Sequence, residues 1–302
     1  MKIFMTGGYG FVGSALTRFL LDKGHEITSL IRGETKAKLL PPKVAWVSGD
    51  PNTEGTWQAS VAGHDVLINL AGATIFQRWT PQYKKLLRDS RILTTRHLVE
   101  AIPRDEASRV TLISTSAVGY YGPTGDEELG ENAPAGSDFL AHLALDWEIE
   151  ALKAEQKGAR VVITRFGVVF GKEGGALQQM ILPFRFFMGG PLGDGHQWFS
   201  WIHIQDLCRG AAHVIENADL RGPVNFTAPV PVRNRDLVRA IGNQLRRPSF
   251  MPAPGFMIRL IFGEFGSVLL AGQRVVPRLL MSRGFQFSYP DVKSALADIL
   301  RD

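Results

Sequence analysis

Three glycines near the amino terminus have the types and spacing of a loop that holds a phosphate group. Gly7, Gly10 and Gly13 lie between a short apolar stretch at 2–6 and a segment at 11–24 whose apolar residues recur at helical spacing. Glycine at the first position permits a left-handed turn, at the second lets a pyrophosphate approach the backbone, and at the third lets the helix pack closely. The free N–H groups at the start of the helix would face the anion. Glycines also serve as turn residues alone, but a strand before and a helix after favour dinucleotide binding.

The end of the second apolar strand discriminates between the two nicotinamide dinucleotides. An acidic residue there hydrogen-bonds a ribose 2'-hydroxyl and repels a 2'-phosphate. Here the strand 26–32 ends in Arg32, Lys36 follows, and Glu34 is the only acid nearby. A guanidinium offers paired donors to a phosphate. We therefore expect NADP(H) in preference to NAD(H); the alternative is that Arg32 is a solvated strand end.

The elements that must position this loop alternate between strands and helices over residues 1–170. Strands are expected at 2–6, 26–32, 44–50, 65–72, 109–117 and 159–171, and a long amphipathic helix at about 81–102. Apolar strands that alternate with helices predict a parallel sheet covered on both faces. We therefore expect an α/β fold whose residues 1–170 form an NADP-binding domain, with a Rossmann-type doubly wound parallel sheet.

The regular alternation weakens after Gly171. A short strand at 224–227 is followed by helices expected at about 234–245, 256–271 and 290–300. We expect residues 171–302 to form a smaller C-terminal α/β substrate or lid domain. It should pack over one end of the sheet and be partly interleaved with the first domain.

Composition narrows the classes of function. The 302 residues are 45% hydrophobic and carry 34 Lys and Arg against 29 Asp and Glu, spread along the chain, for a net charge of +5. This mild excess suits an anionic small molecule better than nucleic acid. The single cysteine, Cys208, excludes an intramolecular disulfide, and no Cys/His cluster predicts a metal site. The apolar stretch 256–271 contains charges and is too short to span a membrane.

No secretory signal precedes the glycine loop. We therefore expect a cytoplasmic protein, monomeric or homodimeric, whose partner is a small-molecule substrate and not nucleic acid or a membrane.

Several segments together resemble the extended short-chain dehydrogenase/reductase superfamily, in its NAD-dependent epimerase/dehydratase group. The resemblance rests on TGGYGFVG at 6–13, NLAG at 69–72 and STSAVGYYG at 114–122. Nearly the whole chain also resembles one subgroup of epimerase family proteins, on strings such as GGPLGDGHQ at 189–197. That subgroup has a characteristic C-terminal segment, here at about 250–298. The resemblance implies an NADP-binding fold of the short-chain dehydrogenase type, without an established substrate.

The resemblance also implies which residues contact the cofactor. Arg32 would lie on the 2'-phosphate and Asp50 near the adenine. Arg91 would face the cofactor from the long helix, or remain an exposed helix arginine, and Val169 lies where the group's backbone passes the nicotinamide. The remaining contacts are Gly7, Gly10, Phe11, Val12 and Gly13 on the pyrophosphate, and Leu70, Ala71 and Gly72 as a wall beside the adenosine.

The usual proton relay of this superfamily is missing. Its members carry a Tyr-x-x-x-Lys pair on the helix after the fifth strand, where the lysine lowers the tyrosine pKa. In this chain Leu140 and Ala144 occupy those positions, and the only such string, at 289–293, lies outside the expected sheet. His142 and Asp146 offer a substitute pair on one helix face, but the apolar stripe of the helix places them on its polar surface.

Better candidates lie in the loop after the fifth strand. By resemblance, Ser116 polarises the substrate oxygen, and Tyr121 or its neighbour Tyr120 passes the proton. The alternative is that both tyrosines pack under the lid. Further candidates to line the pocket are Gln197, Trp198, Trp201 and His203.

Two functions remain open from the sequence. The first is an NADP(H)-dependent oxidoreductase or epimerase that acts on a small polar carbonyl or alcohol. The second is an NADP(H)-binding regulatory or interaction protein that has lost catalysis, which the missing Tyr-Lys pair favours.

Overall fold

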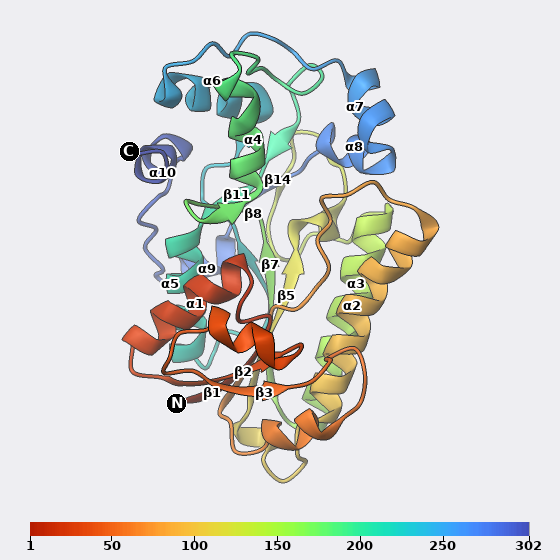
Figure 1. Ribbon diagram of the computed structural model, residues 1–302, viewed down its shortest axis with the longest axis vertical. Helices are drawn as coiled ribbons and strands as arrows, with labels where there is room; N and C mark the ends of the chain where they lie inside the picture. The colour runs from red at the N-terminus through yellow and green to blue at the C-terminus, as the bar shows by residue number, and fades with distance from the viewer. Residues whose placement is uncertain (302) are drawn as a thin grey trace.

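A seven-stranded parallel sheet forms the centre of the computed structural model, which describes residues 1–301 (Figure 1). The chain adds strands first on one side of β1 and later on its other side, so the strand order reverses beside β1. Open α/β sheets bind ligands at such a point, beyond the carboxyl ends of the strands. In spatial order the strands are β12 (Gly222–Phe226), β7 (Arg160–Phe166), β5 (Thr111–Ala117), β4 (Val66–Asn69), β1 (Lys2–Thr6), β2 (Glu26–Ile31) and β3 (Ala45–Ser48).

Helices cover both faces of this sheet, so the doubly wound α/β fold predicted from the sequence is confirmed. Side chains alternate along β1 between the two layers: Ile3 and Met5 join one core cluster and Phe4 joins the other. Helices α1 (Phe11–Asp22) and α5 (Ile204–Glu216) pack together on one face, and α2 (Pro81–Glu100) and α3 (Phe139–Leu152) pack together on the other.

The single strand predicted at 159–171 is wrong, because the chain changes sheets within it. β7 ends at Phe166, and the chain continues as β8 (Val168–Gly171), which pairs with β9 (Gly174–Gly175) and β11 (Trp201–His203) in a separate sheet. A Cβ on Gly167 would lie 2.9 Å from the carbonyl oxygen of Ser200, so the crossing requires glycine. The apolar pattern runs through the break because both strands are largely buried.

The strand predicted at 224–227 belongs to the central sheet and not to the lid. It forms β12, which pairs in parallel with β7 along its whole length. The C-terminal half therefore supplies both an edge strand and helix α5 to the central layers.

A smaller lobe lies beyond the carboxyl ends of the strands, at the top of Figure 1. The helix predicted at 256–271 is two helices, because Gly263 adopts φ +61° between them.

Within residues 1–301, no helix has the length and apolar character needed to cross a membrane. The remaining elements of the second half are α4 (Ala176–Arg185), β10 (Trp198–Phe199), β13 (Val232–Arg233), α6 (Asn234–Leu245), α7 (Gly255–Phe262), α8 (Glu264–Leu269), β14 (Arg274–Val275), which pairs with β6 (Glu128–Leu129), α9 (Arg278–Ser282) and α10 (Val292–Ile299).

Candidate functional site

The glycine loop connects β1 directly to α1. Gly7 has φ +73°, and a Cβ on it would lie 2.9 Å from the carbonyl carbon of Leu70. A Cβ on Gly13 would lie only 2.1 Å from the carbonyl oxygen of Gly7. A Cβ on Gly10 would make only an ordinary contact, 3.4 Å from the carbonyl oxygen of Gly7. The fold thus requires Gly7 and Gly13, whereas Gly10 keeps its backbone uncovered.

Helix α1 begins without a capping side chain. Its N-cap is the exposed Gly10, and its first turn contains no acidic residue. Within residues 1–301, the N–H groups of Phe11, Val12 and Gly13 have no side-chain acceptor, and they lie at the positive end of the helix dipole. This arrangement fits a pyrophosphate. The Phe11 side chain does not take part, because its ring packs against Gly175.

Arg32 and Asp50 meet just after β2 and β3. Arg32 Nε lies 3.1 Å from Asp50 Oδ1, and each side chain is 48% exposed. Asp50 also accepts a hydrogen bond from the backbone N–H of Asn52. Among residues 1–301 the guanidinium of Arg32 makes no hydrogen bond with good geometry, and about half of its side chain is exposed. The outer edge of the guanidinium is thus available to an anion.

The segment after β4 lies against the glycine loop. The backbone N–H of Leu70 donates to the carbonyl oxygen of Thr6 at 3.2 Å, and that of Ala71 donates to Thr6 Oγ1 at 3.3 Å. Gly72 follows, with an exposed backbone. The structure thereby brings the predicted wall beside the predicted pyrophosphate loop.

Arg91 reaches this wall from α2. Its guanidinium donates to the carbonyl oxygens of Leu87, at 3.1 Å, and Ala73, at 3.0 Å, and lies 5.3 Å from the ring centre of Trp147. Burial lowers the pKa of Arg91 to about 10. Arg91 forms no ion pair in the described part of the chain, so its buried charge is offset only by two neutral carbonyl oxygens and the Trp147 ring. A negatively charged or strongly polar ligand beside Gly72 would satisfy it.

Val169 lies on β8, opposite Ile202 of β11. It packs against the same core cluster as Val12, on the side of the sheet that α1 covers. The structure therefore places it on the same face as the pyrophosphate loop.

Ser116, Arg165 and Asn225 form a row across three neighbouring strands. The register of the sheet pairs Ser116 with Arg165 and Arg165 with Asn225, so the three side chains leave the same face. Glu148 of α3 meets them there: it accepts from Ser116 Oγ at 2.6 Å and from Arg165 Nε and Nη2 at 2.9 and 2.7 Å. Although burial opposes it, the hydrogen bonds and charge of Glu148 raise the pKa of Arg165.

Tyr121 completes this buried network. Its hydroxyl donates to Asn225 Oδ1 at 2.7 Å and accepts from Arg165 Nη1 at 2.9 Å. Burial raises the pKa of Tyr121, although the charge of Arg165 opposes the shift. Ser116 is 1% exposed and Tyr121 is 3% exposed. The hydroxyls of both residues are therefore engaged inside the protein.

Tyr120 differs from its neighbour. Its ring is partly exposed, its centre lies 3.5 Å from Cζ of Arg165, and it meets the Tyr121 ring edge-on at 5.3 Å. The phenol oxygen makes no hydrogen bond within residues 1–301. Of the three predicted catalytic residues, only Tyr120 keeps its hydroxyl available to a ligand.

The positions of the usual Tyr-Lys pair are apolar on α3. Leu140 lies against Gly119 and joins an apolar cluster that includes Trp79, while Ala144 is buried. His142 is exposed, and Asp146 forms an ion pair with Arg88 at 2.8 Å instead of bonding to His142. The substitute pair is therefore a feature of the helix surface.

The other pocket candidates hold the lobe together. Trp201 stacks on Phe170 with ring centres 5.6 Å apart. Gln197 donates to the carbonyl oxygens of Leu192 and Leu269, and Trp198 Nε1 donates to Asp126 Oδ1. Trp201, Gln197 and Trp198 therefore stabilise the lobe.

His203 is also a structural residue. Its Nδ1 caps α5 by accepting from the N–H of Gln205 at 3.2 Å, and its ring packs on Tyr289 at 3.8 Å. Burial lowers the pKa of His203, with the nearby Asp298 opposing. The Tyr289 and Lys293 string therefore lies beside α5.

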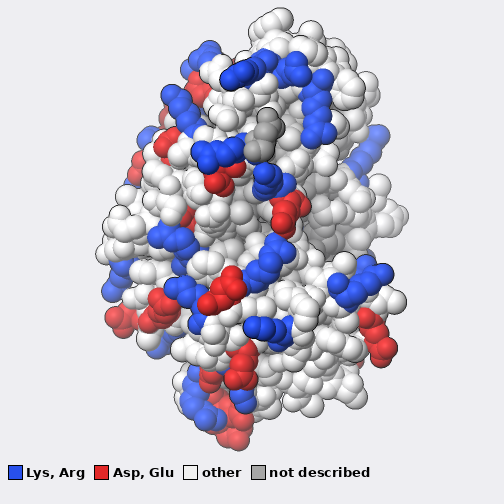
Figure 2. Space-filling model, turned by 60° about the vertical axis from the view of Figure 1, so that its left-hand side comes forward, with Lys and Arg blue, Asp and Glu red and all other residues white. Residues whose placement is uncertain are grey.

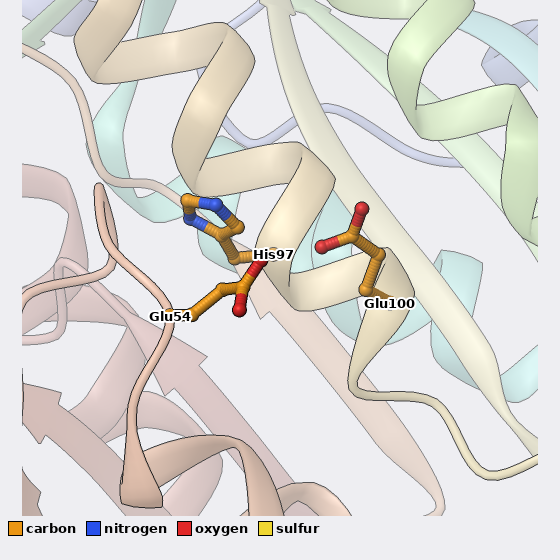
Figure 3. Close-up of side chains that lie close together, drawn as sticks. All are labelled: Glu54, His97 and Glu100. Atoms are coloured by element: carbon orange, nitrogen blue, oxygen red, sulfur yellow. The ribbon is translucent and has the colours of Figure 1, made fainter.

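Glu54, His97 and Glu100 gather where the loop after β3 meets the end of α2 (Figure 3), with one possible ligand atom from each within 4.8 Å of the others. His97 Nδ1 lies 3.1 Å from the carbonyl oxygen of Pro51, which anchors the loop after β3. Both carboxylates are exposed to water, which solvates them without an ion, so we assign no metal here.

Glu148, Arg165 and Asn225 were not among the residues selected from the sequence. Arg165 interrupts an apolar strand, and Glu148 follows Trp147 on a helix that is otherwise buried there. A charged residue in a buried strand requires a partner, so each was a detectable signal.

Comparison with known proteins places this geometry in a family. Residues 3–226 match the model of the NAD dependent epimerase/dehydratase family, and residues 253–299 match a domain of unknown function, DUF1731. The chain is 41% identical over 303 residues to the epimerase family protein SDR39U1 homolog, chloroplastic, of Arabidopsis thaliana, covering 100% of this chain and 87% of the relative. It is 40% identical to the epimerase family protein YfhF of Bacillus subtilis, covering 100% and 99%.

A solved structure is similar over its whole length. The crystal structure of human epimerase family protein SDR39U1 (isoform 2), described with NADPH, superposes with a TM-score of 0.88 at 34% identity, and 100% of each chain is covered.

Proposed function

This chain belongs to the NAD-dependent epimerase/dehydratase family, and we propose that it is an NADP(H)-dependent oxidoreductase or epimerase of a small polar carbonyl or alcohol. The uncapped start of α1 beside the glycine loop carries this proposal, because it fits the anion of a dinucleotide. The human relative described with NADPH supports the same cofactor. The available edge of Arg32 supports the choice of NADP(H).

Each part of the cofactor is assigned to residues near the carboxyl ends of the strands. Arg32 holds the 2'-phosphate, Asp50 lies near the adenine, Arg91 faces the cofactor beside Gly72, and Val169 lies where the nicotinamide passes. Hydride transfer at nicotinamide C4 is the chemistry that this cofactor supplies when bound. The pyrophosphate is assigned to Gly7, Gly10, Phe11, Val12 and Gly13, and the adenosine wall to Leu70, Ala71 and Gly72.

Tyr120 is the proposed proton donor to the substrate oxygen. Of the three predicted hydroxyls, that of Tyr120 makes no hydrogen bond within residues 1–301, and the Arg165 cation beneath its ring stabilises negative charge there. Ser116 and Tyr121 then act as positioning residues, since they fix Glu148 and Arg165 below Tyr120.

Arg32→Ala is expected to weaken NADPH binding by about 10- to 100-fold, because a hydrogen bond to a charged group contributes about 1.5–3 kcal/mol. NADH affinity should stay unchanged, since NADH has no 2'-phosphate. Fluorescence titration of both nucleotides measures the difference. Lys43→Ala, which removes an exposed cation in the loop before β3, is the control and should alter neither affinity more than about twofold. An equal loss for both nucleotides would assign Arg32 to the fold instead.

Tyr120→Phe is expected to lower turnover by about 10²–10⁴-fold while NADPH binding is kept. The assay is oxidation of NADPH against a panel of small aldehydes, ketones and keto sugars. Tyr289→Phe removes a hydroxyl beside α5 and should retain full activity. Full activity in Tyr120→Phe would remove the phenol from the mechanism.

The apolar Leu140 and the engaged hydroxyls of Ser116 and Tyr121 favour a second candidate, an NADP(H)-binding regulatory protein without catalysis. Such a protein would bind NADPH as tightly as the proposed enzyme. With every carbonyl in the panel, however, NADPH oxidation would stay at the background rate measured without protein.

A further inference from the structure

Eleven large apolar side chains are exposed in two segments of the C-terminal lobe. Three of them project strongly: Phe250 is 78% exposed, Leu260 74% and Phe256 70%. Monomeric proteins rarely expose so many large apolar side chains together without a function. The others are Leu182, Phe186, Phe187, Met188, Met251, Met257, Ile261 and Phe262.

The two segments lie side by side. The backbone N–H of Met251 donates to the carbonyl oxygen of Gly189 at 3.1 Å, and that of Ala253 donates to the carbonyl oxygen of Pro191 at 2.9 Å. Helix α7 begins two residues later. We call residues 182–188 and 246–262 the apolar cap, since they form one end of the molecule.

Helix α7 is held firmly at the edge of this cap. Its Ile258 is 5% exposed, and a Cβ on Gly266 of α8 would lie 2.6 Å from the Ile258 carbonyl oxygen. The two helices therefore touch along their backbones, and the apolar face of α7 is displayed on a fixed support.

All charged residues of the apolar cap are positive. Arg185, Arg246, Arg247 and Arg259 are exposed, and the cap contains no Asp or Glu. Arg247 lies 4.3 Å from the ring centre of Phe187, so basic and apolar groups share one surface. Figure 2 shows an arc of basic side chains across the upper end of the molecule, beside uncharged surface.

This charge pattern identifies the kind of partner. In a twofold dimer the same surface meets itself, which would bring the arginines of one cap against those of the other. An anionic partner is required instead. Exposed aromatic and aliphatic side chains flanked by arginines match the headgroup region of a negatively charged bilayer.

We propose that the apolar cap docks on the surface of an anionic lipid membrane. Phe250, Phe256 and Leu260 enter the headgroup region, and the arginines pair with lipid phosphates. The expectation of no membrane partner rested on the lack of a spanning segment, but docking on a surface needs none.

Flotation with lipid vesicles tests the proposal on the full chain. The protein is expected to float with vesicles of equal parts phosphatidylcholine and phosphatidylglycerol, and to remain unbound with phosphatidylcholine alone. Leu260→Asp should lower the bound fraction at least tenfold, and so should Arg246→Gln combined with Arg247→Gln. Ile149→Asp, on an exposed position of α3, is the matched control and should bind as the unmodified protein does.

The side chain of Leu260 is exposed, so Leu260→Asp should leave the unfolding midpoint unchanged, which separates lost docking from lost folding. Absence of flotation with anionic vesicles, or equal flotation of Leu260→Asp, overturns the proposal. A dimer in light scattering that Leu260→Asp dissociates, without vesicle binding, assigns the cap to self-association.

Discussion

Arg165→Met is expected to lower the free energy of unfolding by about 3–5 kcal/mol. The change leaves the Glu148 carboxylate buried with only the hydroxyl of Ser116 as a donor, and it removes the donor to the Tyr121 hydroxyl. A buried charge without its partner is among the most costly single defects. Urea unfolding of the cofactor-free protein, followed by circular dichroism, measures the loss.

Two further variants show whether the loss comes from the unpaired charge. Arg165→Met combined with Glu148→Met should recover most of the stability, because neither charge remains. Arg88→Met breaks an ion pair whose side chains are about half exposed, so it should cost less than about 1 kcal/mol. Equal costs for Arg165→Met and Arg88→Met would mean that the buried network does not fasten α3 to the sheet.

Gly10→Ala is expected to abolish most NADPH affinity without affecting stability. Gly10 has φ −75°, which alanine adopts, and a Cβ there has no neighbour nearer than 3.4 Å. The free energy of unfolding should therefore change by less than about 0.5 kcal/mol. A methyl group on this exposed backbone would hold the pyrophosphate away, and we expect affinity to fall at least about tenfold, or about 1.4 kcal/mol.

Gly13→Ala provides the contrast. Its Cβ would lie 2.1 Å from the Gly7 carbonyl oxygen, so the loop and helix must separate, at a cost of about 1–3 kcal/mol. This variant should lose stability and NADPH binding together. Unfolding curves and NADPH titration of both variants give the comparison. Unchanged NADPH affinity in Gly10→Ala would mean that the pyrophosphate does not pass this residue.

The central sheet could be predicted from the sequence because its strands are short apolar runs separated by helices. The sheet change at Gly167 could not, since the apolar pattern continues from β7 into β8 and does not record which strand each one pairs with. The placement of β12 beside β7 depends on the same long-range pairing, so 224–227 was assigned to the lid.

The cofactor loop was predictable because its function depends on local backbone geometry, at Gly7 above all. The direction of the Ser116 side chain was not, because it depends on Glu148, which lies 32 residues away on α3. A motif identifies Ser116 and Tyr121. Only the register of β5 and β7 shows that Ser116 lies beside Arg165, and only the folded loop after β5 brings the Tyr121 hydroxyl within 2.9 Å of Arg165.

The ratio of NADPH to NADH affinity in the unmodified protein tests the account most directly. Fluorescence titration should show NADPH binding at least about tenfold more tightly, a difference of about 1.4 kcal/mol. The reason is that only NADPH carries a 2'-phosphate for the available edge of Arg32. Equal affinities, or tighter binding of NADH, would contradict the proposed NADP(H) site.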